Sequence, residues 1–479
     1  MGKIEKRKII YILIGIVLVI ACIAGGIFFV RANQTDEPTL EEIVSDKLSA
    51  YRTDLADSLD TLSSNEKVAD YLLSWASNKN IKAEKDQNNN VIFSLKATSK
   101  DLKNGKPVVV ACEYDSSDML SYLDAVSTAL TVAKNAKNHG AFQVLFMPVE
   151  KGSMVGTEAV SEKYFTNDTE LFFIGKSGTS KVSLTTGGYE RLLISDKLKR
   201  CKPSYDKAYK ISIKNVPSQL PGNKMNALPN PIKTLGNLLA NFKSTSLLFE
   251  LSSFSGGESA DTLPSDASMT VVINASDEEK FCSRMDNAIE KFNEKYAADY
   301  PDITYTYEEV KLPKKVLTKT ETENIVSLMY TAPNGIYYKD DDGTVLALTN
   351  IGKISTKNAK LSIEICSMSC SDELLDEIHD SYRTIAGLCN VKIRQAKSYK
   401  IFSGGGASSA LLADFEEAFT AFTGDSEMIV EDAVETTPCN VFYEKNSSMG
   451  MLYCAVTEKT KEKFAGSIIT FLDNGENTN

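Results

Sequence analysis

The hydrophobic pattern begins with one long apolar run near the N-terminus. Residues 9–30 contain no charged side chain over 22 positions, and about 20 apolar residues are enough for a helix to cross a bilayer. The basic residues before the run are Lys3, Lys6, Arg7 and Lys8. Because a basic flank stays in the cytoplasm, we expect a single-pass helix in the cell membrane. Residues 1–8 would be cytoplasmic, and the main domain would be extracytoplasmic.

A cleaved signal sequence is the alternative interpretation of this run. Val19-Ile20-Ala21-Cys22 resembles a bacterial lipoprotein cleavage box. The chain remains apolar beyond that point, through Val30, whereas lipoproteins usually become polar there. We therefore prefer an uncleaved anchor and leave lipidation of Cys22 open. Both interpretations place the protein at the outer face of a membrane.

The next segment has the periodicity of an α/β domain. After a polar linker over 31–38, apolar residues at helical spacing predict a helix over 39–61. Ser63-Ser64-Asn65-Glu66 has the composition of a capping box and predicts the start of a second helix. Strands are predicted at 91–95, 107–112, 142–148 and 171–174, and a helix at 121–137. Largely apolar strands between helices are typical of an α/β sheet.

The pattern changes between about 190 and 397. Alternating runs such as Lys210–Lys214 and Leu361–Cys366 predict half-exposed strands. Helices are predicted near 232–242, 278–297, 320–330 and 372–387. This order indicates two successive α+β halves that form a different domain.

The α/β pattern returns after about residue 398. The sequence predicts a helix over 408–422 closed by Gly424, a strand over 428–434 and a final helix over 457–472. The predicted fold is therefore a discontinuous α/β domain formed by 39–189 and 398–475. An α+β domain at 190–397 is inserted into it.

Composition narrows the possible partners and chemistry. The 479 residues carry a net charge of −11, which argues against nucleic acid as a partner because such proteins need a basic surface. Nine cysteines occur without a CxxC pair, and we interpret most of them as small buried apolar residues. His139 and His379 are the only histidines, although imidazole is a frequent zinc ligand. Neither histidine lies in a ligand motif.

Three segments in chain order carry a resemblance to a known family. They are Asn65–Leu73, Val144–Glu150 and Ser255–Pro264. These segments resemble the bacterial aminoacyl-histidine dipeptidases, which belong to the zinc aminoacylase and carboxypeptidase clan of metallopeptidases. The resemblance extends over roughly residues 39–475. It implies a zinc-exopeptidase-like α/β domain with an inserted α+β domain that acts as a lid and dimerisation module.

The resemblance also implies where a two-zinc site would lie. Members of the family hold two zinc ions with two histidines and three acidic ligands, and a glutamate acts as general base. Their His-Leu-Asp motif matches Glu113-Tyr114-Asp115, so the histidine is replaced while the aspartate that orients it remains. The bridging aspartate matches Asp124, and the general base matches Glu150.

The remaining ligand positions carry residues of other kinds. Lys151 stands where the family has its second glutamate, and Lys176 matches an aspartate ligand that follows an apolar strand. Glu435 matches the histidine near the C-terminus. The substrate-binding histidine of the family's lid should fall near Gln219 or Leu220.

These replacements change the expected chemistry of the site. A lysine ammonium has no lone pair to give a metal, so two lysines remove ligands and supply positive charge instead. We therefore do not expect zinc as a cofactor. We expect an ion-pair network in which Lys151 and Lys176 lie within salt-bridge reach of Asp115, Asp124 or Glu150.

Two functions from different classes remain open. The first is a catalytically inactive, membrane-anchored module that binds a peptide or protein in the interdomain cleft, with a possible homodimer through the lid. The second is an active metal-dependent dipeptidase with an all-oxygen site for Mg²⁺, Ca²⁺ or Mn²⁺. Its ligands would come from Glu113, Asp115, Asp124, Glu150 and Glu435. A purely structural outer domain is a third alternative.

Overall fold

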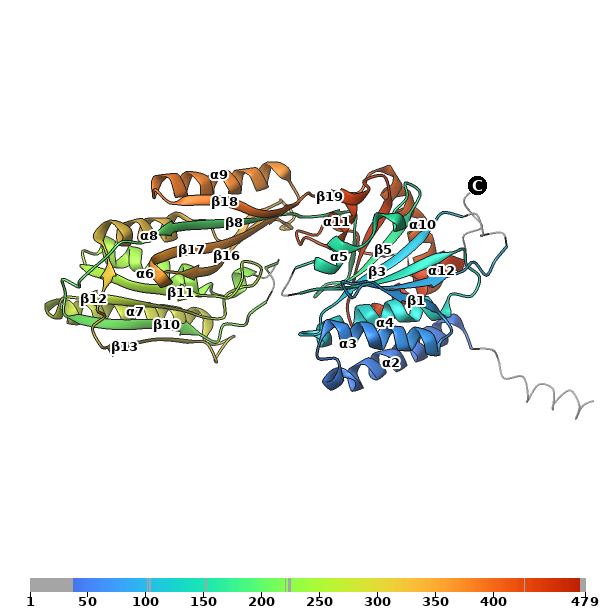
Figure 1. The fold of residues 1–479 in the computed structure, drawn as a ribbon, viewed down its shortest axis with the longest axis horizontal. Coiled ribbons are helices and arrows are strands. Elements are labelled where there is room, and N and C mark those ends of the chain that lie inside the picture. The colour runs from blue at the N-terminus through green and yellow to red at the C-terminus, as the bar shows by residue number, and fades with distance from the viewer. Residues whose placement is uncertain are drawn as a thin grey trace, which may run out of the picture.

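A computed structural model describes residues 38–473, apart from 101, 103, 104, 151, 152, 220, 223, 224 and 426. The predicted membrane helix at 9–30, Cys22 and Lys151 lie outside the described residues. Within the described part of the chain, no helix combines the length and the apolar character needed to span a bilayer. The chain forms two lobes that lie side by side along its longest axis (Figure 1).

The first lobe is built on a seven-stranded sheet with the order β1-β2-β4-β3-β5-β20-β6. The strands are β1 (Lys82–Lys85), β2 (Val91–Leu95), β3 (Val108–Tyr114), β4 (Phe142–Pro148), β5 (Glu170–Lys176), β6 (Lys181–Ser183) and β20 (Gly450–Val456). Strands β4, β3, β5 and β20 run parallel to their neighbours within this group. Strands β1, β2 and β6 pair in the antiparallel direction.

Helices cover both faces of this sheet. The helices on one face are α2 (Leu40–Asp57), α3 (Asn65–Asn78), α4 (Met119–Asn135), α10 (Gly406–Thr423) and α12 (Lys461–Asp473). The other face carries α5 (Val155–Ala159) and α11 (Pro438–Lys445). Val110 and Cys112 of β3 face the first set, whereas Val109 and Ala111 face the second. This burial on both faces explains why the central strands are almost entirely apolar.

The second lobe contains a nine-stranded sheet with the order β13-β10-β12-β11-β16-β17-β8-β18, and β15 pairs with β16. The strands are β8 (Gly188–Lys197), β10 (Lys207–Lys214), β11 (Phe249–Gly256), β12 (Ala267–Ile273), β13 (Thr304–Val310), β15 (Gly335–Lys339), β16 (Val345–Ser355), β17 (Lys360–Ser369) and β18 (Lys392–Tyr399). A separate two-stranded ribbon consists of β9 (Arg200–Cys201) and β14 (Val316–Leu317).

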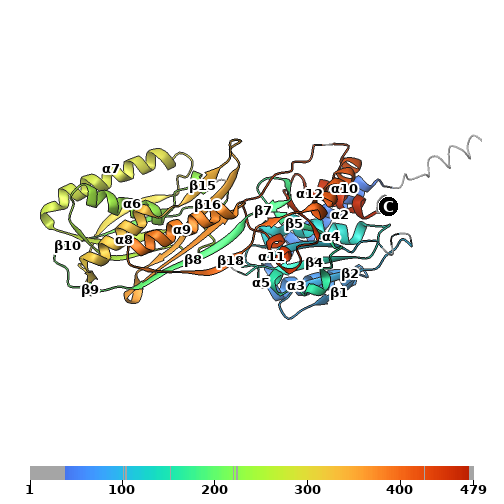
Figure 2. The ribbon, with the colours of Figure 1, turned by 90° about the horizontal axis from the view of Figure 1, so that it is seen from above.

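Four helices pack along this second sheet (Figure 2). They are α6 (Pro231–Ser244), α7 (Glu278–Tyr296), α8 (Lys319–Thr331) and α9 (Asp372–Leu388), close to the four predicted positions. Strands β11 and β16 pair through Ser255 with Ser355 and Gly256 with Ile354. The two predicted α+β halves therefore share one continuous sheet and one hydrophobic core.

The two chain segments that join the lobes pair with each other. Strand β7 (Thr185–Thr186) and strand β19 (Phe402–Ser403) form an antiparallel ribbon. The buried Asn440 side chain fixes this ribbon to α11: its Nδ2 donates to the carbonyl oxygens of Gly187 at 3.0 Å and Lys400 at 2.8 Å. Its Oδ1 accepts from the hydroxyl of Thr186 at 2.7 Å and from the amide of Thr437 at 2.8 Å.

Two local predictions are wrong. Helix α3 begins at Asn65 with Ser64 as its N-cap, so the predicted capping box at 63–66 does not form. Lys67, not an acidic residue, occupies the third helical position and donates its amide to Ser64. The predicted strand at 428–434 makes only isolated bridges, Val182 with Val430 and Thr186 with Ala433. Gly424 ends α10 in the left-handed conformation, as predicted.

Candidate functional site

The candidate site lies at the carboxyl ends of the central parallel strands. In open α/β sheets, ligands bind outside this edge, where loops leave the strands. Glu113 is the penultimate residue of β3, and Lys176 is the last residue of β5. Asp118 lies at the N-cap position of α4, which follows β3 after a short loop. The parallel order therefore brings these three side chains to one edge of the sheet.

Lys176 forms the central ion pair of the site. Its Nζ lies 3.2 Å from Oδ2 of Asp118 and 3.9 Å from the centre of the Tyr122 ring. The aromatic face and the carboxylate both favour the cation. The prediction that Lys176 pairs with Asp115, Asp124 or Glu150 is wrong, since its partner is Asp118. The sequence did not show which carboxylate the lysine side chain would reach.

Asp124 lies on another side of α4. Its Oδ1 accepts from Nε of Arg52 in α2 at 2.7 Å and lies 3.5 Å from Nζ of Lys461 in α12. Asp118 precedes the first turn, whereas Asp124 is about 9 Å further along the axis at 1.5 Å per residue. The carboxylate at the start of α4 is therefore Asp118, and Asp124 contributes to packing between helices. A correct prediction that α4 begins at Met119 would have identified Asp118 as the carboxylate at the start of this helix.

Glu113 is a half-buried carboxyl group with one neutral donor. The hydroxyl of Thr157 donates to Glu113 Oε1 at 3.2 Å. Burial raises the pKa of Glu113 to about 7, and the Thr157 hydroxyl and the Lys176 ammonium only partly oppose that shift. Glu113 therefore takes up a proton near neutral pH, unlike an ordinary surface glutamate.

The loop after β3 is fixed by hydrogen bonds between its own residues and by hydrogen bonds to α3. The amide and hydroxyl of Ser117 donate to Asp115 Oδ1 at 2.8 and 2.6 Å. The Oδ1 of Asn65 accepts a hydrogen bond from the amide of Ser116 at 3.0 Å, and its Nδ2 donates to the carbonyl of Val149 at 3.0 Å. Asn65, the first residue of the first resemblance segment, thus holds together the loops that follow β3 and β4.

Two further predicted residues lie around the same edge. Glu150 is exposed just beyond β4, where its backbone pairs with that of Ser153. Glu435 lies next to a loop of the second lobe. Its Oε1 is 3.5 Å from the position that a Cβ atom would take on Gly222. Burial raises the pKa of Tyr453, and the Glu435 and Glu113 carboxylates raise it further. Tyr453 is therefore a shared neighbour of both acids that the sequence did not identify.

These positions do not fit a two-zinc centre. Among the described residues, no group of three or more histidine, cysteine, aspartate or glutamate side chains is placed to hold a metal ion. The predicted all-oxygen set is also divided, since Asp124 contacts Arg52 and Asp115 binds its own loop. A lysine cation paired with Asp118 further lowers the number of oxygen ligands free for a metal.

The two histidines lie away from this site. The His139 ring is close to the carbonyl of Gly140, with 2.6 Å between Nδ1 and the oxygen. His379 belongs to α9 in the second lobe, where Nδ1 lies 2.6 Å from Oε1 of the buried Glu190. Both rings are therefore engaged in local packing and hydrogen bonding.

Comparison with known proteins shows which proteins this chain is similar to. The chain is 20% identical over 369 residues to cytosol non-specific dipeptidase of Escherichia coli (strain K12), a match that covers 70% of this chain and 76% of the relative. The crystal structure of aminoacylhistidine dipeptidase from Vibrio alginolyticus aligns with a TM-score of 0.64 and 18% identity, covering 88% of this chain and 96% of that one. The chain is therefore similar to an aminoacylhistidine dipeptidase in fold and to a non-specific dipeptidase in sequence. No family profile matches it.

The likeness to the aminoacyl-histidine dipeptidases supports the predicted resemblance and the α/β peptidase fold. At 18% identity, the structural match shows the fold and not the chemistry. The side chains at the strand ends therefore have to be interpreted from their own contacts. In this chain, the strand ends carry the Lys176–Asp118 ion pair, a glutamate that can take up a proton, and hydrogen-bonded loops.

Proposed function

We propose that this chain is a membrane-anchored, catalytically inactive homologue of aminoacyl-histidine dipeptidase. Its outer domain would bind a peptide or protein between the lobes, with Glu150 idle as a base. The observation that carries this proposal is the Lys176 ammonium, which pairs with Asp118 at the end of β5. The resemblance assigns an acidic zinc ligand to the position of Lys176.

The energetic consequence of losing the metal is large. Zinc lowers the pKa of a bound water from 15.7 to about 7. Without zinc, forming hydroxide costs roughly 12 kcal/mol more, at 1.36 kcal/mol for each of nearly nine pKa units. An exposed carboxylate such as Glu150 offers no comparable stabilisation. A site built this way retains shape and charge for binding but lacks an activated nucleophile.

Metal content and peptidase activity test the inactive assignment. We expect purified protein to bind zinc only substoichiometrically in elemental analysis and to leave dipeptides intact. Glu150→Gln should leave both measurements unchanged, because no metal-bound water needs a base. The non-specific dipeptidase of Escherichia coli, assayed in parallel, is the positive control for dipeptide hydrolysis.

The opposite result would favour the alternative function. Near-stoichiometric metal together with dipeptide hydrolysis that Glu150→Gln abolishes would contradict the proposal. The active peptidase with a carboxylate metal site would then be the better explanation. The double variant Lys151→Glu, Lys176→Asp separates the two effects: we expect it to gain metal affinity without activity, since both histidine ligands remain absent.

The proposed location depends on the apolar run at 9–30. Its basic flank predicts that the chain beyond residue 31 lies outside the membrane. Protease added to intact cells should therefore digest the outer domain, and a cytoplasmic marker protein should remain uncut. Complete protection of the domain in intact cells, with digestion only after lysis, would contradict this topology.

A further inference from the structure

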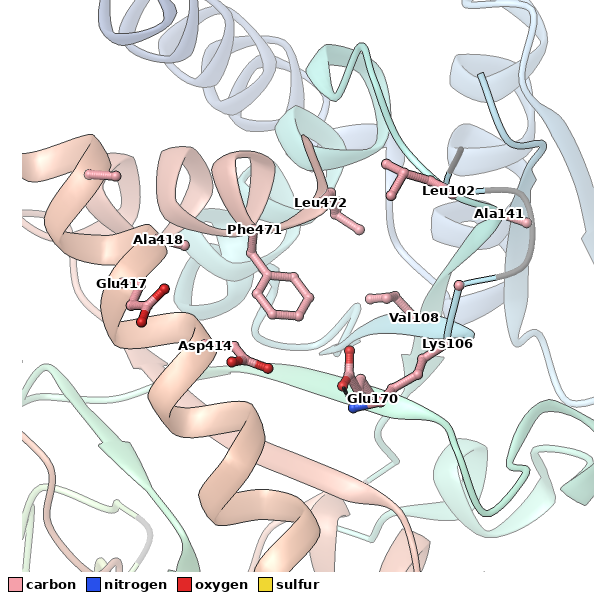
Figure 3. Close-up of a pocket in the computed structure, with 13 residues that line it drawn as sticks. Leu102, Lys106, Val108, Ala141, Glu170, Asp414, Glu417, Ala418, Phe471 and Leu472 are labelled. Carbon is pink, nitrogen blue, oxygen red and sulfur yellow. Dashed lines mark hydrogen bonds and ion pairs between the residues drawn. The ribbon is translucent and has the colours of Figure 1, made fainter. Parts of the chain in front are cut away.

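A cavity lies at the end of the same sheet opposite to the candidate site. It has a volume of about 430 Å³, within the range of small-molecule sites. It opens between α10, α12 and the amino ends of β3 and β5 (Figure 3). Glu170 in its wall is the first residue of β5, and Lys176 in the candidate site is the last. Seven residues of extended strand therefore separate the two places by about 20 Å.

One side of the cavity is apolar. Phe471 and Leu472 of α12 and Val108 of β3 point into it (Figure 3). Ala418 of α10 lines the cavity with only a methyl group, so the space between the two helices is not filled by a larger side chain. A flat or chain-like apolar group would contact these side chains and be removed from water.

The other side carries an excess of negative charge. Asp414, Glu417 and Glu170 line the cavity, and Lys106 is the cation among the described residues that line it. Nζ of Lys106 lies 2.6 Å from Oε1 of Glu170, whose side chain is 10% exposed. The charges of Lys106 and Glu170 therefore balance each other. Within the described residues, no ion pair or hydrogen bond reaches the carboxylates of Asp414 and Glu417.

We propose that this cavity binds an amphipathic organic cation, an amine carried on an apolar body. The body would rest on Phe471, and the ammonium would lie beside Asp414 and Glu417. Charge complementarity selects this ligand class, because a carboxylate would meet two acidic side chains and a neutral molecule would leave them unpaired. The proposal is independent of the function of the site at the other end of the sheet.

The test uses three probes with the same apolar body. They are 4-(4-fluorophenyl)butylamine, the corresponding alcohol and the corresponding carboxylic acid, each followed by fluorine NMR on the full chain in zwitterionic lipid nanodiscs. We expect the amine to bind about tenfold more tightly than the carboxylate, with the alcohol between them. Asp414→Asn should weaken binding of the amine about threefold and leave binding of the alcohol unchanged.

Two sets of variants locate the binding. Ala418→Phe should abolish binding of all three probes by filling the cavity, and its difference from wild type separates binding in the cavity from partition into lipid. Ala421→Phe, at the exposed rim of the cavity, serves the same purpose if Ala418→Phe does not fold. Glu416→Gln, an exposed neighbour on α10 outside the cavity, should change nothing. Equal affinities for the three probes, or binding that the filling variants do not reduce, would overturn the proposal.

Discussion

Replacing Asn440 by alanine is expected to lower the free energy of unfolding by about 3 kcal/mol or more. The Asn440 side chain is completely buried and bonds to both chain segments that connect the lobes. Alanine would leave the buried Thr186 hydroxyl and the buried Thr437 amide without their acceptor, and each buried unsatisfied group costs about 1–3 kcal/mol. Urea unfolding followed by circular dichroism measures the change.

The matched control is an asparagine with a local, exposed bond. Asn287 donates only to the Ser283 carbonyl one turn earlier in α7, and Asn287→Ala should change stability by less than about 0.5 kcal/mol. Limited proteolysis should also cut the Asn440→Ala variant faster at the ribbon of β7 and β19, because this ribbon loses its attachment to α11. A loss of stability no larger than that of the control would show that the Asn440 network does not hold the ribbon.

Replacing Glu113 by glutamine is expected to stabilise the metal-free protein at pH 8 and to have little effect near pH 4. The pKa of Glu113 is about 7 in the folded chain against 4.5 in the unfolded chain. Between these values the folded state holds a proton that the unfolded state has lost, so the free energy of unfolding falls as pH rises. The full shift corresponds to at most about 3 kcal/mol, and partial exposure reduces it to about 1–2 kcal/mol.

Unfolding curves at both pH values, recorded with a chelator present, measure this difference. Glu150→Gln is the control, because Glu150 is an exposed carboxylate at the same edge of the sheet. It should change stability by less than about 0.5 kcal/mol at either pH. If Glu113→Gln were instead less stable than wild type at pH 8, ionised Glu113 would contribute to the fold, as it would in a metal site.

Most elements were predictable because their signals are local. The apolar spacing that predicted helices near 278–297 and 372–387 arises from one face of each helix packing on the sheet, and α7 and α9 lie there. The largely apolar sequence of 142–148 reflects a strand buried on both faces, and β4 has these bounds. The run at 428–434 also contains several apolar residues, but it makes only isolated bridges. Composition alone does not report strand pairing.

The sequence by itself determined the kinds of residue available to the site. The chain has two histidines in 479 residues, and neither lies in a ligand motif, so the sequence argued against a two-histidine zinc centre. Lys176 at the end of an apolar strand indicated a cation at the sheet edge. These conclusions depend on residue identity and on periodicity along the chain. Neither requires knowledge of which segments meet.

Only the tertiary structure decided which side chains are neighbours. Asp118 and Asp124 are both acidic and six residues apart, but the start of α4 places Asp118 beside Lys176 and Asp124 beside Arg52. The pairing of β11 with β16 likewise merges two predicted halves into one sheet. Such contacts join residues far apart in sequence, and they depend on how helices and strands pack. A pattern along one chain carries no record of that packing.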